Sequence, residues 1–304
     1  MEKKTLYRTF NPKEIKTSEL QSLMQGSIAP RPICFASTID KNGNVNLSPF
    51  SFFNMFSTKP PILIFSPSRR VRDNTSKHTL ANVHEIPEVV INMVNFDMVQ
   101  QMSLSSCEYP KGTNEFVKAG FTEEKSLLIK PPRVKESPVQ FECVVNQIIS
   151  LGDEGGAGNL IICEVKLIHI NPDVMTATGK IDQEKIDLVA RLGGDWYSRA
   201  NGDSLFEVPK PLTTLGMGVD QLPDEIRFSK ILTGNDLGML GNTEQFPDAD
   251  SIEVFKRMNK ELQKIHIDFK DDESALKNAL HKLAHQYLEK GKVVDGWKVL
   301  LSIT

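Results

Sequence analysis

Short runs of apolar residues recur through the first two thirds of the chain, and turn-forming residues separate them. Such runs predict β-strands, because a strand buries one or both of its faces over about four to eight residues. Between the first two runs stands Asn42-Gly43, a pair that favours a tight hairpin because both residues tolerate positive φ. The predicted strands cover residues 33–40, 45–53, 61–66, 87–95, 139–151 and 159–170.

Helices interrupt this succession of strands at only a few places. We expect short helices at residues 79–84, 97–103 and 182–190. Asp182 would stand near the N-terminus of the last one, where a negative charge is favourable. Because strands and helices do not alternate regularly, the pattern favours a barrel or sandwich over a doubly wound sheet.

The pattern changes near residue 206. Pro209, Pro211 and Pro223 mark an extended stretch, and between residues 250 and 290 apolar residues recur at the three- or four-residue steps of a helix. We therefore predict a mainly β chain (α+β overall) with a first domain at residues 1–205. A mostly helical C-terminal extension covers residues 206–304, and it would either form a lid over a site or wrap around a dimer.

Composition narrows the class of protein. The chain has 304 residues, of which 39% are hydrophobic and 25% charged, as in ordinary globular proteins. The net charge of −3 argues against a nucleic-acid binder. No apolar run approaches the roughly 20 residues that span a bilayer, and the first residues lack the apolar stretch of a secretory signal peptide. We expect a cytoplasmic protein without membrane or nucleic-acid partners.

Cysteine and histidine spacing gives no metal site. The cysteines form no Cys-x-x-Cys pair, and Cys34, Cys143 and Cys163 lie in apolar runs, so we expect small buried side chains. His281 and His285 are four residues apart, as two ligands on a helix would be, but no third ligand accompanies them. An exposed helix face is the preferred interpretation, and no metal is predicted.

Two stretches carry candidate binding chemistry. Residues 48–54 (Ser-Pro-Phe-Ser-Phe-Phe-Asn) gather hydroxyls, an amide and aromatic rings. They would suit a planar heterocycle, or they form an ordinary strand end with aromatic core residues. Residues 66–82 hold three arginines, a lysine and several hydroxyls between a predicted strand and a predicted helix start. That combination indicates either a phosphate-sized anion site or a solvated basic loop.

Three further features of the sequence each have an ordinary structural interpretation. Glu142, Glu164 and Lys166 alternate with apolar residues on strands, so we expect them to face solvent. Residues 152–158 include four glycines and predict a flexible hairpin tip, although mobile loops can also gate a site. Trp196 either stacks on a bound ring or packs against the barrel.

Three motifs, in this order and spacing, resemble the flavin reductase-like family, which has an FMN-binding split-barrel fold. The resemblance covers about residues 20–200, and His78 stands where the family has aspartate. The motifs are Pro30-Arg31-Pro32 with Ser37-Thr38, Asn42-Gly43, Asn46, Ser48-Pro49-Phe50-Ser51 and Phe53-Asn54; Lys77-His78-Thr79 with Asn82; and Arg191-Leu192-Gly193-Gly194 with Tyr197.

The resemblance implies bound FMN, with FAD as an alternative, and a homodimer with flavin sites near the subunit interface. It implies an NAD(P)H:flavin oxidoreductase that transfers hydride from NADH or NADPH to flavin N5. Because the flavin carries the redox chemistry, such a protein needs no strong acid or nucleophile. Reduced flavin would pass to a partner monooxygenase or to another acceptor.

The resemblance also assigns roles to residues. The isoalloxazine and ribityl groups would be lined by Ser37, Thr38, Ser48, Pro49, Phe50, Ser51 and Asn54, with Arg31 beside them. The phosphate would be held by Ser66, Arg69, Lys77 and Thr79. The nicotinamide side would be approached by Arg191, Tyr197 and His169, although His169 could instead be a turn histidine.

Two further functions remain open at this stage. One is a flavin-binding carrier or sensor without nicotinamide turnover. The other is a split-barrel FMN oxidoreductase that acts on a specific organic substrate.

Overall fold

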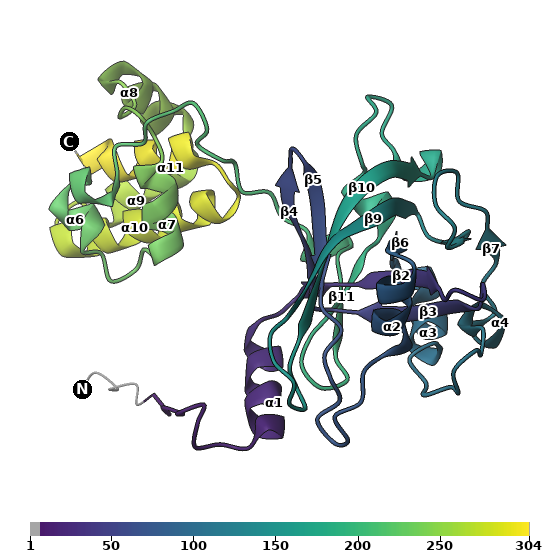
Figure 1. The fold of residues 1–304 in the computed structure, drawn as a ribbon. Coiled ribbons are helices and arrows are strands. Elements are labelled where there is room, and N and C mark those ends of the chain that lie inside the picture. The colour runs from purple at the N-terminus through teal and green to yellow at the C-terminus, as the bar shows by residue number, and fades with distance from the viewer. Residues whose placement is uncertain (1–6, 304) are drawn as a thin grey trace. The chain divides into compact units, whose positions relative to one another are not determined.

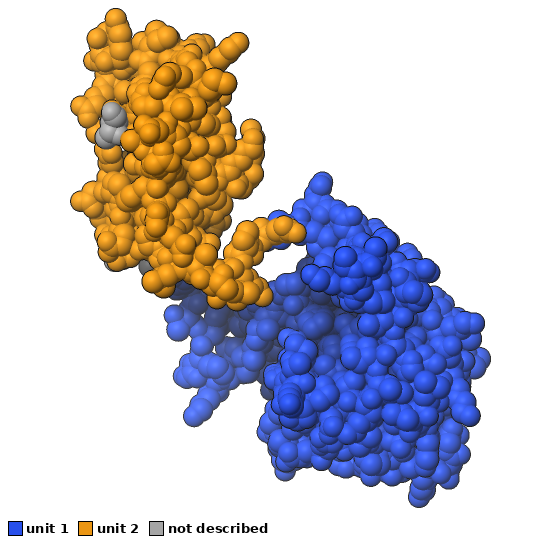
Figure 2. Space-filling model, turned by 90° about the horizontal axis from the view of Figure 1, so that it is seen from above, with its two compact units in different colours: residues 1–206 blue, residues 207–304 orange. Residues whose placement is uncertain are grey.

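The computed structural model describes residues 7–303. The chain divides into two compact units, which we call unit 1 (residues 1–206) and unit 2 (residues 207–304). Figure 2 colours them separately. Unit 1 contains two large apolar cores and unit 2 contains another, and each unit is described by itself.

Unit 1 is built around a seven-stranded antiparallel sheet with strand order β3-β2-β6-β9-β10-β5-β4 (Figure 1). The longest pair, β9 and β10, forms a hairpin. The strands are β2 (Cys34–Ile39), β3 (Val45–Phe50), β4 (Phe53–Thr58), β5 (Pro61–Phe65), β6 (Glu88–Met93), β9 (Val139–Ser150) and β10 (Asn159–Ile170). Two small sheets are formed by β1 (Arg31–Pro32), β11 (Val189–Arg191) and β12 (Tyr197–Arg199), and by β7 (Glu123–Glu124) and β8 (Arg133–Val134).

Alternation along the strands separates two apolar cores. Cys34 and Ala36 of β2 face one core, which contains Phe65, whereas Phe35 faces the other, which contains Phe116. Both faces of the sheet are therefore covered at β2. The first core also contains the three cysteines expected to be buried, and each of them is fully buried.

Helices cover parts of this sheet. Helix α2 packs on β2 and β3, and α4 packs on β3. The helices of unit 1 are α1 (Thr17–Ser27), α2 (His78–Glu85), α3 (Val99–Leu104), α4 (Glu115–Ala119) and α5 (Gln183–Ile186), with 3-10 turns η1 (Phe96–Met98), η2 (Pro172–Val174) and η3 (Gly202–Ser204).

Two predicted elements differ from the structure. The strand expected at 45–53 ends at Phe50, and a new strand, β4, begins at Phe53 and pairs with β5. The helix expected at 182–190 ends at Ile186, because Asp187 adopts a left-handed conformation with φ of 47°, and the chain then continues as β11.

Unit 2 is helical, as predicted for the extension. The helical pattern expected at 250–290 corresponds to three helices, because Asn259 ends α8 and caps α9, and Asp272 caps α10. The core gathers around Trp297, which is fully buried. The helices are α6 (Asp224–Arg227), α7 (Gly234–Gly241), α8 (Ala249–Met258), α9 (Lys260–Asp268), α10 (Glu273–Glu289) and α11 (Val293–Leu300), with 3-10 turns η4 (Val219–Gln221) and η5 (Leu301–Ile303).

The two histidines of α10 do not form an exposed face. His281 is buried and its Nδ1 lies 2.7 Å from Ser229 Oγ, while His285 Nδ1 lies 2.9 Å from a carboxylate oxygen of the buried Asp236. The expectation of an exposed face was wrong for His281, since both rings join α10 to the segment around α7. Among the helices described in residues 7–303, none has the length and apolarity needed to cross a membrane.

Candidate functional site

The basic stretch at residues 66–79, which we call the basic loop, is folded back on itself. Arg69 Nε donates to Asn74 Oδ1 at 2.6 Å, and Arg69 Nη2 donates to the Asn74 carbonyl at 2.8 Å. The Arg70 amide donates to the Thr75 carbonyl at 2.8 Å. Asn74 itself adopts a positive φ of 56°, which an asparagine tolerates in tight turns. These bonds give the loop one defined shape.

The glycine-rich stretch at residues 152–158, which we call the glycine loop, docks against the basic loop instead of ending as a free tip. The Arg69 amide donates to the Ala157 carbonyl at 2.8 Å, and the Gly156 amide donates to the Arg69 carbonyl at 2.9 Å. A Cβ at Gly155 would lie 3.0 Å from the Arg70 carbonyl oxygen, and one at Gly158 would lie 2.7 Å from Ser66 Oγ. Glycine is therefore needed for this close approach.

The basic loop keeps part of its positive charge available. Glu108 pairs with Arg70 at 3.0 Å and also with Arg72. Within residues 7–303, Arg69 and Lys77 have no acidic group at ion-pair distance. Burial, and then the charge of Arg70, lower the pKa of Lys77, while Glu108 partly opposes that shift.

Lys77 also stands at the N-cap of α2, a helix whose N-terminus is capped by no side chain of the described chain. The partial positive charge of a helix N-terminus and its free amides favour an anion. The basic loop therefore carries positive charge at Arg69 and at Lys77, and Lys77 stands at the start of α2 within reach of the charge of Arg70. We call this part of the loop the electropositive corner.

An apolar cavity of about 340 Å³ lies between helix α1 and the end of the sheet. It touches the basic loop at Val71 and the glycine loop at Gly156. The remaining lining residues are Thr17, Leu20, Gln21, Met24, Gln25, Ile28, Arg31 and Phe52. The basic loop thus borders the apolar cavity at Val71, while Ser66, Arg69 and Lys77 are not among the lining residues.

The stretch at 48–54 turns a corner next to this cavity. Ser48 is buried on β3, and Phe50 packs against Phe65 with the ring centroids 5.4 Å apart. Ser51 Oγ accepts from Arg31 Nε at 3.4 Å. The side chain of Asn54 is exposed, and its Oδ1 accepts from the next amide. Pro49 is half-buried on β3.

Arg31 is nearly buried, with 7% of its surface exposed. Its Nη1 donates to the carbonyls of Gln25 and Ile28, and its Nη2 donates to the Leu192 carbonyl at 2.8 Å. Burial, and then the nearby charge of Arg191, lower the pKa of the Arg31 guanidinium. The predicted cofactor residue is thus already engaged by backbone carbonyls.

Arg191 and Tyr197 lie beside this arginine. Arg31 pairs with Arg191 across β1 and β11, and Arg191 pairs with Tyr197 across β11 and β12. The Arg191 guanidinium carbon is 4.6 Å from the centroid of the Tyr197 ring, a distance typical of cation–π contact. Trp196, just before, is 75% exposed.

Of the predicted cofactor residues, Arg31 alone is among the residues that line the cavity. Three of the others are fully buried. Thr38 accepts from Asn82 Nδ2 at 3.1 Å, and Thr79 donates to Asn46 Oδ1 at 2.8 Å. Ser37 is also fully buried, and its Oγ has no hydrogen-bond partner within the described chain. Asn46 and Asn82 belong to the same two sequence motifs as Thr38 and Thr79. That shared membership was the signal in the sequence that these four side chains could meet.

That buried network continues to a residue that the sequence analysis missed. Glu115 of α4 is buried, accepts from Asn46 Nδ2 at 3.0 Å and accepts from the Leu47 amide at 2.9 Å. A glutamate in a short helix gives no sequence signal for such a role. Glu115 therefore links α4, β3 and α2.

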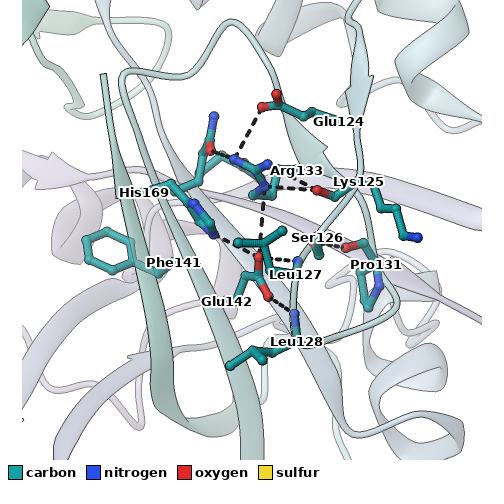
Figure 3. A network of polar contacts seen from close by, with 12 residues as sticks. Glu124, Lys125, Ser126, Leu127, Leu128, Pro131, Arg133, Phe141, Glu142 and His169 are labelled. Atoms are coloured by element: carbon teal, nitrogen blue, oxygen red, sulfur yellow. Dashed lines mark hydrogen bonds and ion pairs between the residues drawn. The ribbon is translucent and has the colours of Figure 1, made fainter. Parts of the chain in front are cut away.

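His169 lies in a different network, shown in Figure 3. Its Nε2 is 2.8 Å from Glu142 Oε1. It stands ten residues along β10 from Asn159, whose amide contacts the basic loop at Pro67. At about 3.3 Å per strand residue, that is roughly 30 Å. Within one chain, His169 therefore lies far from the basic loop.

Glu142 is fully buried, so the expectation that it faces solvent was wrong. Its carboxylate accepts from the amides of Leu127 and Leu128 at 2.8 and 2.7 Å (Figure 3). Burial acts to raise the pKa of Glu142, but these amides and His169 outweigh it, and the pKa lies below its usual value. The buried charge is tolerated because a loop folds over to satisfy it.

Comparison with known proteins assigns most of unit 1 to a protein family. The model of the family described as flavin reductase like domain matches residues 26–183. A protein of Aquifex aeolicus is 38% identical over 199 residues, covering 66% of this chain and 99% of that protein. A protein of Halalkalibacterium halodurans is 35% identical over 192 residues, covering 62% of this chain and 91% of its own length.

Solved structures agree with this assignment. Nitrilotriacetate monooxygenase component B from Bacillus cereus is 29% identical with a TM-score of 0.63, covering 67% of this chain and all of that one (100%). A flavin-reductase-like protein with a split barrel domain from Shewanella frigidimarina is 25% identical with a TM-score of 0.57, covering 67% of this chain and 100% of that one. The predicted split-barrel fold is confirmed, and the chain belongs to the flavin reductase-like family.

Proposed function

We propose that the chain binds FMN in unit 1 and catalyses flavin reduction by NADH or NADPH. The observation that carries the proposal is that the basic loop, which bears the unpaired charges of Arg69 and Lys77, borders an apolar cavity at Val71. A flavin nucleotide has the same two parts, an anionic phosphate and a largely apolar planar ring. Membership of the flavin reductase-like family supports the same conclusion.

The basic loop suits the phosphate. Arg69 and Lys77 supply charge that no acidic group of the described chain neutralises, and charge-assisted hydrogen bonds to an anion are the stronger kind. Ser66 adds a hydroxyl, and the start of α2 adds backbone amides. FAD, with its longer diphosphate and adenine, is the alternative ligand.

The cavity suits the ring. Phe52 and helix α1 offer apolar surface, and Ser48, Pro49, Phe50, Ser51 and Asn54 would line the ring and ribityl chain from the sheet end. When bound, FMN supplies the redox chemistry, the acceptance of a hydride from a nicotinamide at its N5 atom. The protein has to bind the ring, exclude water and leave one face open to the nicotinamide. Arg191 and Tyr197 are the proposed residues on that side.

A homodimer belongs to the proposal. The edge strand β4 exposes Met55 and Phe56, with 63% and 64% of their surfaces accessible. An exposed apolar edge strand favours association. The similarity to a monooxygenase component supports delivery of reduced flavin to a partner monooxygenase.

The deciding experiment is anaerobic. Purified protein is loaded with FMN, NADH or NADPH is added, and the visible flavin absorbance is followed in a stopped-flow instrument. We expect rapid bleaching with one of the two nucleotides, because hydride transfer needs only close and aligned rings. In air, the rate of NADH or NADPH oxidation is then measured with and without added free flavin. A rate that depends on added flavin indicates a diffusing flavin, and a rate that does not indicates a fixed one.

Other outcomes would redirect the assignment. Flavin that binds tightly but stays oxidised with both nucleotides would favour a carrier or sensor. Reduced flavin that is reoxidised only when a particular organic compound is present would favour an oxidoreductase with a specific substrate. Absence of flavin binding would contradict the proposal altogether.

A further inference from the structure

Helix α1 forms one side of the cavity although little of it is buried. Leu20, Gln21 and Met24 are among its lining residues. Every residue of α1 is nonetheless at least partly exposed, and Met24 keeps 51% of its surface accessible. A helix that buries no side chain fully gains little stabilisation from packing, so its position depends on what holds its ends.

The C-terminal end of α1 is held by charge. Its last turn contains no basic residue, and the last carbonyls of any helix lack partners within that helix. Arg31 supplies both the positive charge and the hydrogen-bond donors that this end lacks. Its Nη1 donates to the Gln25 carbonyl at 2.5 Å and to the Ile28 carbonyl at 2.6 Å. A cation at this position also meets the partial negative charge of the helix terminus.

The same guanidinium joins the helix end to the sheet. Nη2 donates to the Leu192 carbonyl at 2.8 Å, and Nε donates to Ser51 Oγ at 3.4 Å. Four hydrogen bonds thus use four of the five N–H donors of Arg31. One buried side chain connects α1, the segment after β11 and the corner before β4.

The N-terminal end of α1 is held differently. Thr17 lies against the glycine loop, with its Cγ2 3.0 Å from the position that a Cβ at Gly156 would take. This contact is apolar and has no charge to strengthen it. The C-terminal end of the helix is therefore held by charged hydrogen bonds, whereas its N-terminal end is held by a weaker apolar contact.

We propose that α1 is a hinged wall of the flavin cavity, turning about the grip of Arg31 and closing over the ring of the bound flavin. Arg31 is a positioning residue in this arrangement. It sets the affinity for the ring through α1 and does not contribute to phosphate binding. The inference rests on the proposed function, because it takes a flavin as the ligand.

The test compares two ligands in an Arg31→Lys variant. FMN and riboflavin share the ring, and only FMN carries the phosphate. Lysine keeps the charge but lacks the planar fork that reaches several carbonyls at once. We expect both affinities, measured by flavin fluorescence titration, to fall by the same factor of roughly tenfold, which corresponds to about one net hydrogen bond. The FMN-to-riboflavin affinity ratio stays as in the wild type.

Hydrogen exchange gives a second readout that a general loss of stability would not reproduce. In flavin-free Arg31→Lys protein, the amides of α1 should exchange faster while those of β9 and β10 do not change. Added flavin should slow exchange in α1. The matched control is Arg257→Lys on the exposed surface of unit 2, which should alter neither affinity nor exchange in α1.

Gly193→Ala tests the same hinge without touching Arg31. A Cβ at Gly193 would lie 2.9 Å from the Cα of Gly26 in α1, so the substitution pushes the helix end away. It should weaken both flavins equally, and it carries the test if Arg31→Lys fails to fold.

Three results would overturn the inference while flavin binding by the wild type stands. One is an FMN-to-riboflavin ratio that collapses in Arg31→Lys, which would mean that Arg31 acts on the phosphate. Another is unchanged affinity in both variants. The third is α1 in flavin-free wild type that exchanges as slowly as the sheet, which would make the wall fixed. A wild-type protein that binds neither flavin refutes the proposed function instead, and the hinge with it.

Discussion

Lys77 is a half-buried cation at a helix start, and no acidic group among residues 7–303 forms an ion pair with it. Its pKa is lowered. Burial and the charge of Arg70 both disfavour the ammonium form. An anion bound beside Lys77 would reverse that penalty, since it supplies the opposite charge that the fold leaves out. The residue is thus better suited to a ligand than to the stability of the empty fold.

Lys77→Ala should weaken FMN binding by about 1.5–3 kcal/mol, the contribution of a hydrogen bond to a charged group, or roughly ten- to hundredfold in affinity. Riboflavin binding should change little, because riboflavin has no phosphate. Isothermal titration with both ligands measures the difference. Lys180→Ala, at an exposed turn, is the control. FMN affinity that survives in Lys77→Ala would remove the residue from the site.

Glu142 shows the opposite arrangement, a buried charge that the fold satisfies completely. Glu142→Gln keeps the shape but leaves only one acceptor oxygen for the amides of Leu127 and Leu128, so we expect a loss of about 1–3 kcal/mol in the stability of unit 1 at pH 7. The folded-state pKa of Glu142 is lowered. Its charge therefore stabilises the fold above the unfolded-state pKa of about 4.3, and this contribution is lost as the pH falls through the folded-state pKa.

Calorimetry at pH 7 and near pH 4 checks this prediction. The unfolding transition of unit 1 is recognised as the one whose midpoint shifts when flavin is added. The gap between wild type and Glu142→Gln should shrink at the lower pH. Glu164→Gln on the neighbouring strand, where Glu164 is ion-paired with Lys166 at the surface, should leave the midpoint unchanged. A gap of constant size would show that the charge of Glu142 is not what stabilises the loop.

Residues that look alike in the sequence can have different roles, and only their surroundings in the fold show which role each one has. Thr38, Thr79 and Ser66 all carry hydroxyls that the resemblance placed at the flavin, yet the first two are buried in side-chain hydrogen bonds to asparagines while Ser66 begins the basic loop. Glu142 and Glu164 both alternate with apolar neighbours on strands, but only the first is covered by a distant loop. Sequence patterns report which face a side chain shares, and they do not report which segment folds over that face.

At the scale of elements, the contact between the glycine loop and the basic loop decides how the cations are presented. Gly155→Ala would put a Cβ 3.0 Å from the Arg70 carbonyl oxygen and 3.1 Å from that of Val71. Both obstacles are backbone atoms, so the two loops have to separate. We expect FMN binding to weaken severalfold, with riboflavin affected less.

The control for this substitution is Gly238→Ala in α7, where the added Cβ meets open space. Alanine inside a helix should if anything stabilise unit 2, by up to about 1 kcal/mol. Binding titrations of both variants separate loop docking from the general effect of replacing glycine. Equal FMN affinity in Gly155→Ala and wild type would mean that the basic loop keeps its shape alone.

The elements that the sequence predicted are those with a strong burial pattern. Strands β5, β6 and β10 lie where apolar runs indicated them, because those runs fill the core. Helix α1 and strand β4 were missed, since both are largely exposed and so carry no clear alternation. These two elements border the cavity and the sheet edge, so the sequence indicated the family and its motifs but not the wall of the site.

At the scale of the whole molecule, the chain joins a family domain to a second folded unit. The family match ends at residue 183, whereas unit 2 begins at residue 207. Unit 2 has a core of its own around Trp297, whose Nε1 donates to Thr243 Oγ1 at 3.0 Å and whose ring meets Phe246 at 4.9 Å. Because each unit has apolar packing of its own, we expect two unfolding transitions.

Trp297→Ala should therefore lower only one of those transitions. Removing a fully buried tryptophan leaves a large cavity and costs about 3–5 kcal/mol, enough to unfold a small helical unit at moderate temperature. Flavin binding and the transition of unit 1 should stay as they are, because the proposed site lies wholly in unit 1. Calorimetry and FMN titration of the variant measure both. The chain has two tryptophans, Trp297 in unit 2 and the exposed Trp196 in unit 1, so Trp196→Phe is the matched substitution that should leave unit 2 intact. A Trp297→Ala protein that loses FMN binding would mean that unit 2 supports the flavin site, and the division of function between the units would have to be withdrawn.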